Sequence, residues 1–155
     1  MMPRYGTPPR KGTAYRRRPG AYALLLRGGR MLVTRQVSGE IDEVQLPGGG
    51  IDAGEAPGPA ALREIAEETG YRATLLRHLA SYRQFSWMPD YGFHAEKVCH
   101  VYLGRVTRRV GPPTEAGHTA LWMSPEEALA RLASPGNRAV LAAWLGRPVG
   151  RSRRA

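Results

Sequence analysis

The sequence predicts a single mixed α/β domain, from its length and from the order of its apolar patterns. Its 155 residues suit one compact unit with one core. Short strand-like runs lie on both sides of residues 59–69, where apolar residues recur at three- and four-residue spacing, as on one face of a helix. The simplest arrangement of these elements is a sheet with one helix packed on each side.

The segment ahead of the helical pattern predicts a β-hairpin. Residues 21–27 read AYALLLR, an apolar run typical of a buried strand, and residues 31–35 read as its partner. Gly28 and Gly29 supply the turn between them. Residues 44–46 predict a further short strand.

The segment after the helical pattern predicts further strands and then helices. Gly70 is a helix stop signal, and strand-like runs follow over 73–85, 98–106 and 120–123. Ser124, followed by a proline and two glutamates, is typical of a helix start. This helix is expected to run to about residue 132, and a final helix over 137–145.

The formal net charge of +10 is concentrated at the two ends of the chain. Six lysines and arginines fall within residues 1–18 and four within 147–155, with no acid in either stretch, so residues 19–146 are neutral. We expect a basic flexible N-terminal tail (1–18), a folded domain (19–146) and a basic C-terminal tail (147–155). Because a nucleic-acid-binding domain more often carries its charge on a folded face, nucleic acid is not the expected partner, although the tails are basic.

Cysteine content and hydropathy predict a cytoplasmic protein. A single cysteine, Cys99, excludes an internal disulfide framework, and its apolar surroundings predict a buried, unreactive thiol. No apolar run approaches the roughly 20 residues that span a bilayer, and no signal-peptide pattern follows the N-terminus. We therefore expect no membrane association.

Three carboxylates within the helical pattern indicate a metal site. Glu64, Glu67 and Glu68 are spaced i, i+3 and i+4, so they share one helix face. Their mutual repulsion calls for a compensating cation, and Mg²⁺ prefers oxygen ligands. The glycine-rich run 48–50 lies ahead of them, where backbone can approach a metal or phosphate closely. Together these features predict a magnesium site for phosphates, with Mn²⁺ as a possible substitute.

The segment from Gly48 to Tyr71 resembles the Nudix box of the MutT-like pyrophosphohydrolases. The pattern of that box is G-x5-E-x7-R-E-U-x-E-E-x-G-U, with U a bulky apolar residue. Every specified position is filled, by Gly49, Glu55, Arg63, Glu64, Ile65, Glu67, Glu68, Gly70 and Tyr71. Tyr71 stands where a branched aliphatic residue is more usual, a difference expected to concern packing. The spacing is far more specific than a lone glycine pattern.

The resemblance implies a fold, a reaction and a set of roles. The implied fold is an α/β/α sandwich around a central mixed β-sheet, and the implied reaction is hydrolysis of the pyrophosphate bond in a nucleoside diphosphate derivative. Glu64, Glu67, Glu68 and the carbonyl of Gly48 would be metal ligands. Arg63 would orient the glutamates, supported by Glu55, with Gly49 and Gly70 completing the motif.

The general base and the substrate contacts are less well marked. The base is expected to be a box glutamate or one from a later loop, for which Glu115 is the first candidate and Glu96 the second. Arg35 and Arg83 are candidates for phosphate contacts, with solvated or salt-bridged surface positions as the alternative. Aromatic residues that follow the box are candidates for stacking on a base, although strand aromatics more often belong to the core. The candidates are Tyr82, Phe85, Trp87, Tyr91 and Phe93.

Several functions fit these residues. ADP-ribose or another nucleotide sugar, a dinucleoside polyphosphate and a nucleoside triphosphate are all open as substrates. A non-catalytic nucleotide sensor is a second hypothesis, and a decapping-like enzyme of RNA ends that uses the basic tails is a third. A homodimer is possible.

Overall fold

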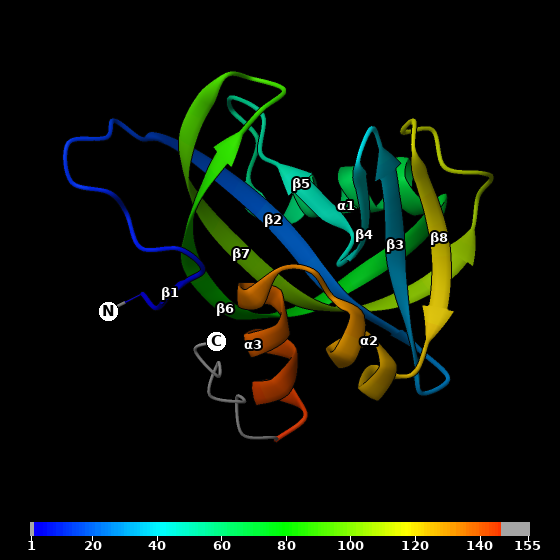
Figure 1. The fold of residues 1–155 in the computed structure, drawn as a ribbon. Helices are drawn as coiled ribbons and strands as arrows, with labels where there is room; N and C mark the ends of the chain where they lie inside the picture. The colour runs from blue at the N-terminus through cyan, green and yellow to red at the C-terminus, as the bar shows by residue number, and fades with distance from the viewer. Residues whose placement is uncertain (1, 147–155) are drawn as a thin grey trace.

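The structure is a computed structural model that describes residues 2–146. Its centre is a mixed eight-stranded sheet with helices on both faces (Figure 1). The strands are β1 (Arg4–Tyr5), β2 (Arg16–Arg27), β3 (Arg30–Ser38), β4 (Ile41–Gln45), β5 (Gly48–Gly50), β6 (Tyr71–Met88), β7 (Phe93–Arg109) and β8 (His118–Met123). The helices are α1 (Pro57–Thr69), α2 (Pro125–Arg131) and α3 (Pro135–Trp144).

The sheet combines antiparallel hairpins with two parallel pairs between strands far apart in sequence, β1–β6 and β2–β7. Its strand order is β1-β6-β7-β2-β3-β4, with β5 paired to β2 and β8 paired to β3. The hairpin pairs β6–β7 and β2–β3 are antiparallel, whereas β2 and β7 run parallel from Arg16 opposite Ala95 to Leu26 opposite Arg105. The β2–β7 pair joins the N-terminal part of the chain to the second strand after the box.

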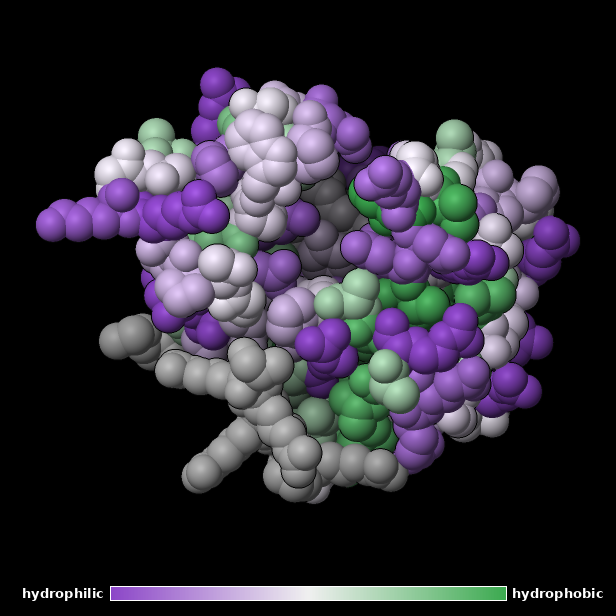
Figure 2. All heavy atoms as spheres, in the orientation of Figure 1, coloured by the Kyte–Doolittle hydropathy of each residue, from purple (hydrophilic) through white to green (hydrophobic). Residues whose placement is uncertain are grey.

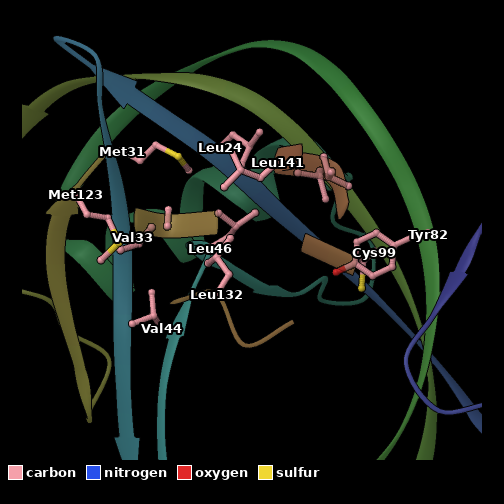
Figure 3. Packing of buried hydrophobic residues seen from close by; sticks show 13 residues of the cluster. Leu24, Met31, Val33, Val44, Leu46, Tyr82, Cys99, Met123, Leu132 and Leu141 are labelled. Atoms are coloured by element: carbon pink, nitrogen blue, oxygen red, sulfur yellow. The ribbon is translucent and has the colours of Figure 1, made fainter. Parts of the chain in front are cut away.

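The apolar run of β2 serves two cores because its side chains alternate across the sheet. Ala23 and Leu25 pack with Ile65 of α1 on one face. Leu24 packs on the other face with Leu132 and with Leu141 of α3 (Figure 3). A strand covered on both faces is apolar at nearly every position, which is why 21–26 reads as a continuous apolar run.

The α/β/α fold and the order of its elements confirm the sequence-based expectation. The first predicted strand, its glycine turn and its hairpin partner are β2 and β3, and the last two predicted helices are α2 and α3. One face differs from the simplest arrangement, because two short helices rather than one cover it (Figure 1). The strands are also longer than predicted, since polar residues at the end of a sheet still pair through their backbones.

The N-terminal boundary was predicted wrongly. Residues 16–18 belong to β2 and pair with β7, and Arg4–Tyr5 forms a short parallel strand beside β6. Backbone pairing is indifferent to side-chain charge, so a run of arginines can occupy a strand whose side chains reach solvent. The basic C-terminal tail predicted over 147–155 lies outside the described residues.

Helix α1 begins and ends where its sequence requires. Pro57 stands in the first turn, where a missing N–H costs nothing. Gly70 ends the helix with φ +75°, and a Cβ there would lie 1.9 Å from the Gly111 carbonyl oxygen. Tyr71, the unusual box residue, packs edge-on against Trp122 with ring centroids 5.6 Å apart, which confirms its expected packing role. Within residues 2–146, no helix is long and apolar enough to cross a membrane.

Candidate active site

A cavity of about 510 Å³ opens beside the N-terminal end of β5 and the C-terminal half of α1. Figure 2 shows a hollow near the middle of this face of the molecule. Glu64, Glu68, Glu115 and His118 line one part of it. The β6–β7 hairpin and the start of α3 line the other.

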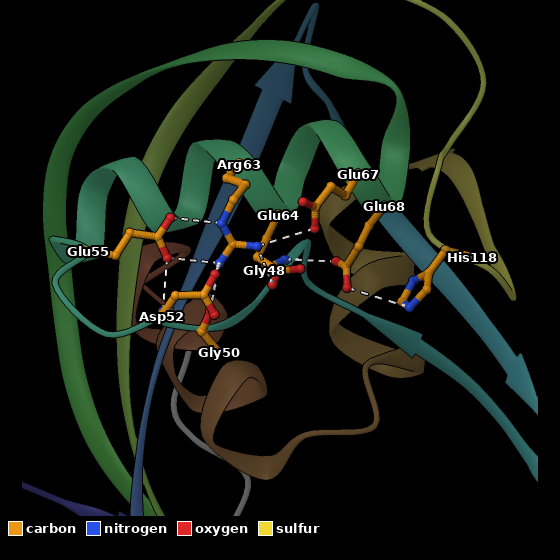
Figure 4. Close-up of polar contacts among 9 residues, drawn as sticks. All are labelled: Gly48, Gly50, Asp52, Glu55, Arg63, Glu64, Glu67, Glu68 and His118. Atoms are coloured by element: carbon orange, nitrogen blue, oxygen red, sulfur yellow. Dashed lines mark hydrogen bonds and ion pairs between the residues drawn. The ribbon is translucent and has the colours of Figure 1, made fainter.

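Arg63 connects the acidic residues of the box to one another (Figure 4). Its guanidinium donates two hydrogen bonds to Glu55, at 2.8 and 2.9 Å, and one to the Gly50 carbonyl at 3.0 Å. It also donates to Glu64 at 3.1 Å and to Glu67 at 3.3 Å. The hydrogen bonds from Arg63 and from the Asp52 N–H hold the pKa of Glu55 at about 2. Glu55 is thus a charged anchor for Arg63, and Arg63 orients two of the three carboxylates.

Glu68 is the most buried carboxyl group of the site, at 6% exposure. Burial raises its pKa to about 8, and the nearby Glu64 and Glu115 carboxylates act in the same direction. The N–H of Gly48 donates to one oxygen of Glu68 at 2.9 Å and opposes this rise. In the protein alone, Glu68 is therefore largely protonated at neutral pH.

His118 faces the second oxygen of Glu68 and was not predicted as a site residue. Its Nε2 lies 3.6 Å from Glu68 Oε2, and its Nδ1 is hydrogen-bonded to the buried Thr34 hydroxyl at 2.9 Å. Burial lowers the pKa of His118 and raises that of Glu68, so at neutral pH this is a contact between neutral groups rather than an ion pair. The sequence carries no local signal for it, because β3 and β8 supply Thr34 and His118 from separate parts of the chain.

Gly49 allows Glu64 to approach the glycine-rich strand. A Cβ built at Gly49 would lie 2.8 Å from the carboxyl carbon of Glu64, so any larger residue would displace that carboxylate. Burial raises the pKa of Glu64, and Arg63 counteracts this. The motif therefore requires glycine at position 49 because a larger side chain there would collide with Glu64.

The structure separates the two base candidates. Glu115 lines the cavity, and its N–H donates to the carbonyl of Glu67 at 2.9 Å. Glu96 lies outside the cavity wall and accepts a hydrogen bond from Arg83 at 3.0 Å, with Arg17 at 3.7 Å. Only Glu115 is therefore placed near the box glutamates.

Most of the predicted substrate contacts are not in the cavity wall. The guanidinium of Arg35 donates two hydrogen bonds to the Asp42 carboxylate, at 2.7 and 2.8 Å, on an exposed part of the β3–β4 hairpin. Strand alternation turns Arg83 and Phe85 to the face of β6 opposite Gln84 and Ser86, which do line the cavity. Trp87, near the end of β6, lines the mouth and is 53% exposed.

Tyr82 lines the cavity but is also part of the core. It is 2% exposed and lies among the buried residues of the cluster (Figure 3). Its hydroxyl donates a hydrogen bond to Asn137 Oδ1 at 2.7 Å. Gly136 leaves room for its ring, because a Cβ there would lie 2.2 Å from it. Cys99 is buried nearby, and burial raises its thiol pKa, as expected for an unreactive cysteine.

The donor set fits a hard divalent cation. Carboxylate oxygens of Glu64, Glu67 and Glu68 lie on one helix face, and two of these side chains have raised pKa values because of burial and mutual repulsion. Among residues 2–146 no group of three acidic, histidine or cysteine side chains is already gathered as a metal cage, since Arg63 holds Glu64 and Glu67. A cation would relieve the repulsion and release the proton of Glu68.

A model of the NUDIX domain matches residues 16–144 of the chain. The chain belongs to the Nudix family. The match begins at the first residue of β2, in agreement with the corrected boundary. A Nudix hydrolase structure from Nitrosomonas europaea shares this fold at a TM-score of 0.71 with 18% identity, covering 84% of this chain and 90% of that one.

Two curated relatives of the chain illustrate the range of named activities. A CMP-5′-(N-acetyl-N-hydroxy-3-aminopropyl)phosphonate hydrolase of Streptomyces rubellomurinus is 34% identical over 124 residues, which are 76% of this chain and 57% of that protein. A putative 8-oxo-dGTP diphosphatase of Bacillus subtilis is 31% identical over 110 residues, 68% of this chain and 66% of that protein. The matched region therefore spans less than two thirds of each relative.

Proposed function

We propose that this Nudix domain hydrolyses the pyrophosphate bond of a nucleoside diphosphate derivative with Mg²⁺ as cofactor. The observation that carries the proposal is the Arg63-bridged set of carboxylates at the wall of a cavity. Glu64 and Glu68 line that cavity, and Glu67 is tied to the same arginine. Mn²⁺ is the expected substitute, because it accepts the same oxygen ligands.

The residues of the chain divide the work of the reaction. A bound cation supplies charge neutralisation at the phosphate oxygens and lowers the pKa of a water molecule. Glu64, Glu67 and Glu68, with the Gly48 carbonyl, would hold it. Arg63 keeps the carboxylates in one orientation, and Glu115 is the candidate that accepts a proton from the attacking water. The water oxygen bonds to phosphorus as the bridging P–O bond breaks, and the leaving phosphate takes the electron pair.

The cavity supports a nucleotide as the attached group. Its volume, about 510 Å³, is within the range of small-molecule sites. Both named relatives act, by their names, on compounds that contain a nucleotide. A nucleotide sugar, a dinucleoside polyphosphate and a nucleoside triphosphate are the candidate classes. A purely sensing role is less well supported, since such a role needs no complete set of box carboxylates.

The test is turnover of a nucleotide panel by the protein and by Glu68→Gln. With Mg²⁺, we expect the protein to release phosphate-containing products from at least one nucleoside diphosphate derivative. Glu68→Gln should lose about 100-fold or more in kcat with its fold intact, because a charge-stabilising group of the transition state is weakened. Glu127→Gln removes an exposed helix glutamate and serves as the matched control. Wild-type turnover by Glu68→Gln would refute the assignment.

A further inference from the structure

Two histidines and a serine form a hydrogen-bonded group on the β6–β7 hairpin, apart from the box. His78 Nε2 lies 2.9 Å from the hydroxyl oxygen of Ser81, and His100 Nδ1 lies 2.8 Å from the same oxygen. The two ring nitrogens therefore point at one position and can be no farther apart than 5.7 Å, the sum of these distances. The proposed hydrolysis uses none of these residues. We call His78 and His100 the histidine pair.

The position of His78 depends on an irregularity in β6. In a regular strand, residues three apart point to opposite faces of the sheet. The pairing of β6 with β7 shifts in register between His78 and Ala80, so His78 and Ser81 share a face. Ser81 is paired directly with His100 of β7. The bulge thus turns one histidine toward the other, and such bulges are over-represented beside functional sites, where they re-aim side chains.

The histidine pair lies on the sheet face opposite the cavity. Cys99 lines the cavity, and strand alternation turns the adjacent His100 to the other face. On that face, Tyr102 packs against the apolar cluster at the start of α1. The ring of His78 meets Tyr102 edge-on, with centroids 5.4 Å apart. A ligand of the histidine pair would therefore be separated by the sheet from a substrate in the cavity.

Neutral imidazole nitrogens suit a transition metal ion such as Zn²⁺, whereas Mg²⁺ prefers oxygen. Burial and the neighbouring His78 lower the pKa of His100, so its ring is neutral at pH 7 and can donate a lone pair to an ion. Zn–N bonds are about 2.0 to 2.1 Å long, so a tetrahedral ion needs the two nitrogens about 3.3 Å apart. The side chain of His78 is exposed and has room for the rotation that this requires.

The basic residues of β6 on either side of the group do not oppose a cation there. Arg83, the next residue of β6 on the same face as Ser81, donates a hydrogen bond to Glu96 at 3.0 Å and is neutralised by it. Arg77 is paired with Leu103, whose side chain packs into the core on the opposite face. An ion at the histidine pair would therefore not meet an unpaired guanidinium from these two positions.

The two histidines define an exchangeable site rather than a structural one. Structural zinc sites use four protein ligands. Within residues 2–146, no third histidine, cysteine or acidic side chain completes a metal-binding group with the pair. Water would therefore fill the remaining positions, and the ion would stabilise the folded chain only at concentrations that keep it bound.

We propose that His78 and His100 bind Zn²⁺ at a second metal site, separate from the magnesium site of the box. The ion takes the position between His78 Nε2 and His100 Nδ1 at which the Ser81 hydroxyl now lies. It joins β6 to β7 across the bulge. The site contributes no group to hydrolysis, so it goes beyond the proposed function and does not depend on it.

The test is calorimetric titration with Zn²⁺ of the protein without a histidine tag. Excess Mg²⁺ is present, so that the box carboxylates are occupied. His78→Gln and His100→Gln each remove one imidazole from the pair and keep a polar side chain. His94→Gln is the matched control, because His94 is a histidine of the same hairpin that contacts Tyr15 and Trp87 instead.

We expect one Zn²⁺ to bind per chain, and each variant of the pair to weaken that binding tenfold or more. His94→Gln should leave the affinity within about twofold of the wild type, since His94 supplies no ligand. A second measurement needs no variant. In ¹⁵N-edited spectra of the wild-type imidazoles, Zn²⁺ should shift Nε2 of His78 and Nδ1 of His100 and leave both nitrogens of His94 in place.

Unchanged Zn²⁺ affinity in His78→Gln and His100→Gln would overturn the proposal, and so would an equal loss in His94→Gln. Loss of all Zn²⁺ binding when Mg²⁺ is added would also overturn it, because the ion would then belong to the box carboxylates. Binding is measured without substrate. A protein that binds Zn²⁺ in this way and hydrolyses no nucleotide would therefore refute only the proposed function.

Discussion

The two sides of the cavity are built differently. On the α1 side, Glu55, Arg63, Glu64 and Glu67 lie within 13 consecutive residues and are joined by hydrogen bonds of 2.8 to 3.3 Å. On the opposite side, the wall is assembled from residues of three separate elements, β6, β7 and α3, for example Gln84, Lys97 and Asn137. A short helical motif therefore carries the residues of the proposed reaction, while residues that only the tertiary structure brings together line the side where we propose that the attached group binds.

The difference implies that substitutions on the α1 side should lower kcat and substitutions on the far side should raise KM. Interactions made only in the transition state affect kcat, and binding that is uniform through the reaction affects KM. Four further experiments test this comparison.

The largest effect is expected for Arg63→Lys. Lysine keeps the charge but cannot reproduce the planar set of donors that joins Glu55, Glu64 and Glu67. We expect kcat to fall about 100-fold, the upper range for partners that orient metal ligands. Arg131→Lys is the control, since Arg131 forms an i,i+4 pair of the same 3.3 Å length on α2. A higher KM with unchanged kcat would assign Arg63 to substrate binding instead.

The next effect concerns stability without metal. The folded pKa of Glu68 is about 8 against an ordinary value of 4.5, so between these pH values the folded state keeps a proton that the unfolded state has lost. This contribution is complete below pH 4.5 and is lost as pH rises through 8. We expect the free energy of unfolding in EDTA to fall by about 3 kcal/mol from pH 5.5 to 8.5, measured with urea.

Glu68→Gln should remove this decline, because glutamine does not titrate. Mg²⁺ should reduce it in the wild type by stabilising the carboxylate. If Glu68→Gln lost stability over the same pH range as the wild type, other groups would be responsible.

A smaller effect is expected at His118, and it separates two polar substitutions. The side-chain amide nitrogen of glutamine reaches about as far as Nε2 of the histidine ring and can donate to Glu68. The side-chain amide of asparagine reaches only about as far as Nδ1, the ring nitrogen that faces Thr34. We expect His118→Asn to lower kcat and Mn²⁺ affinity about tenfold, and His118→Gln to retain most of both. Steady-state kinetics and electron paramagnetic resonance of bound Mn²⁺ provide the measurements. Equal losses in the two variants would mean that His118 acts only through packing.

The smallest effect is expected at Lys97, on the far side. Lys97→Met should raise KM about fivefold and leave kcat within about twofold, because a uniform electrostatic attraction is removed. Arg77→Met, an exposed change in the middle of β6, is the control. A drop in kcat with unchanged KM would contradict the division between the two sides.

Much of the fold was predictable because its signals are local. The glycine turn between β2 and β3, the helix stop at Gly70 and the proline and acids behind Ser124 each depend on neighbouring residues. The first strand was predicted too short because its outer part is polar, and strand pairing there depends on β7, about 80 residues away. Polar edges of sheets carry little periodic signal.

By itself, the sequence determined the box and therefore the family and the kind of chemistry, because helical spacing places Arg63, Glu64, Glu67 and Glu68 together wherever that helix lies. The tertiary structure decided which later residues join them. It selected Glu115 over Glu96 for the cavity wall, brought His118, which is hydrogen-bonded to Thr34, to Glu68, and turned Arg83 and Phe85 away from the cavity. It also placed Arg16–Arg18 in the sheet beside the cavity mouth. The physical reason is strand pairing, which sets the neighbours of these residues across distances in sequence that no local pattern records.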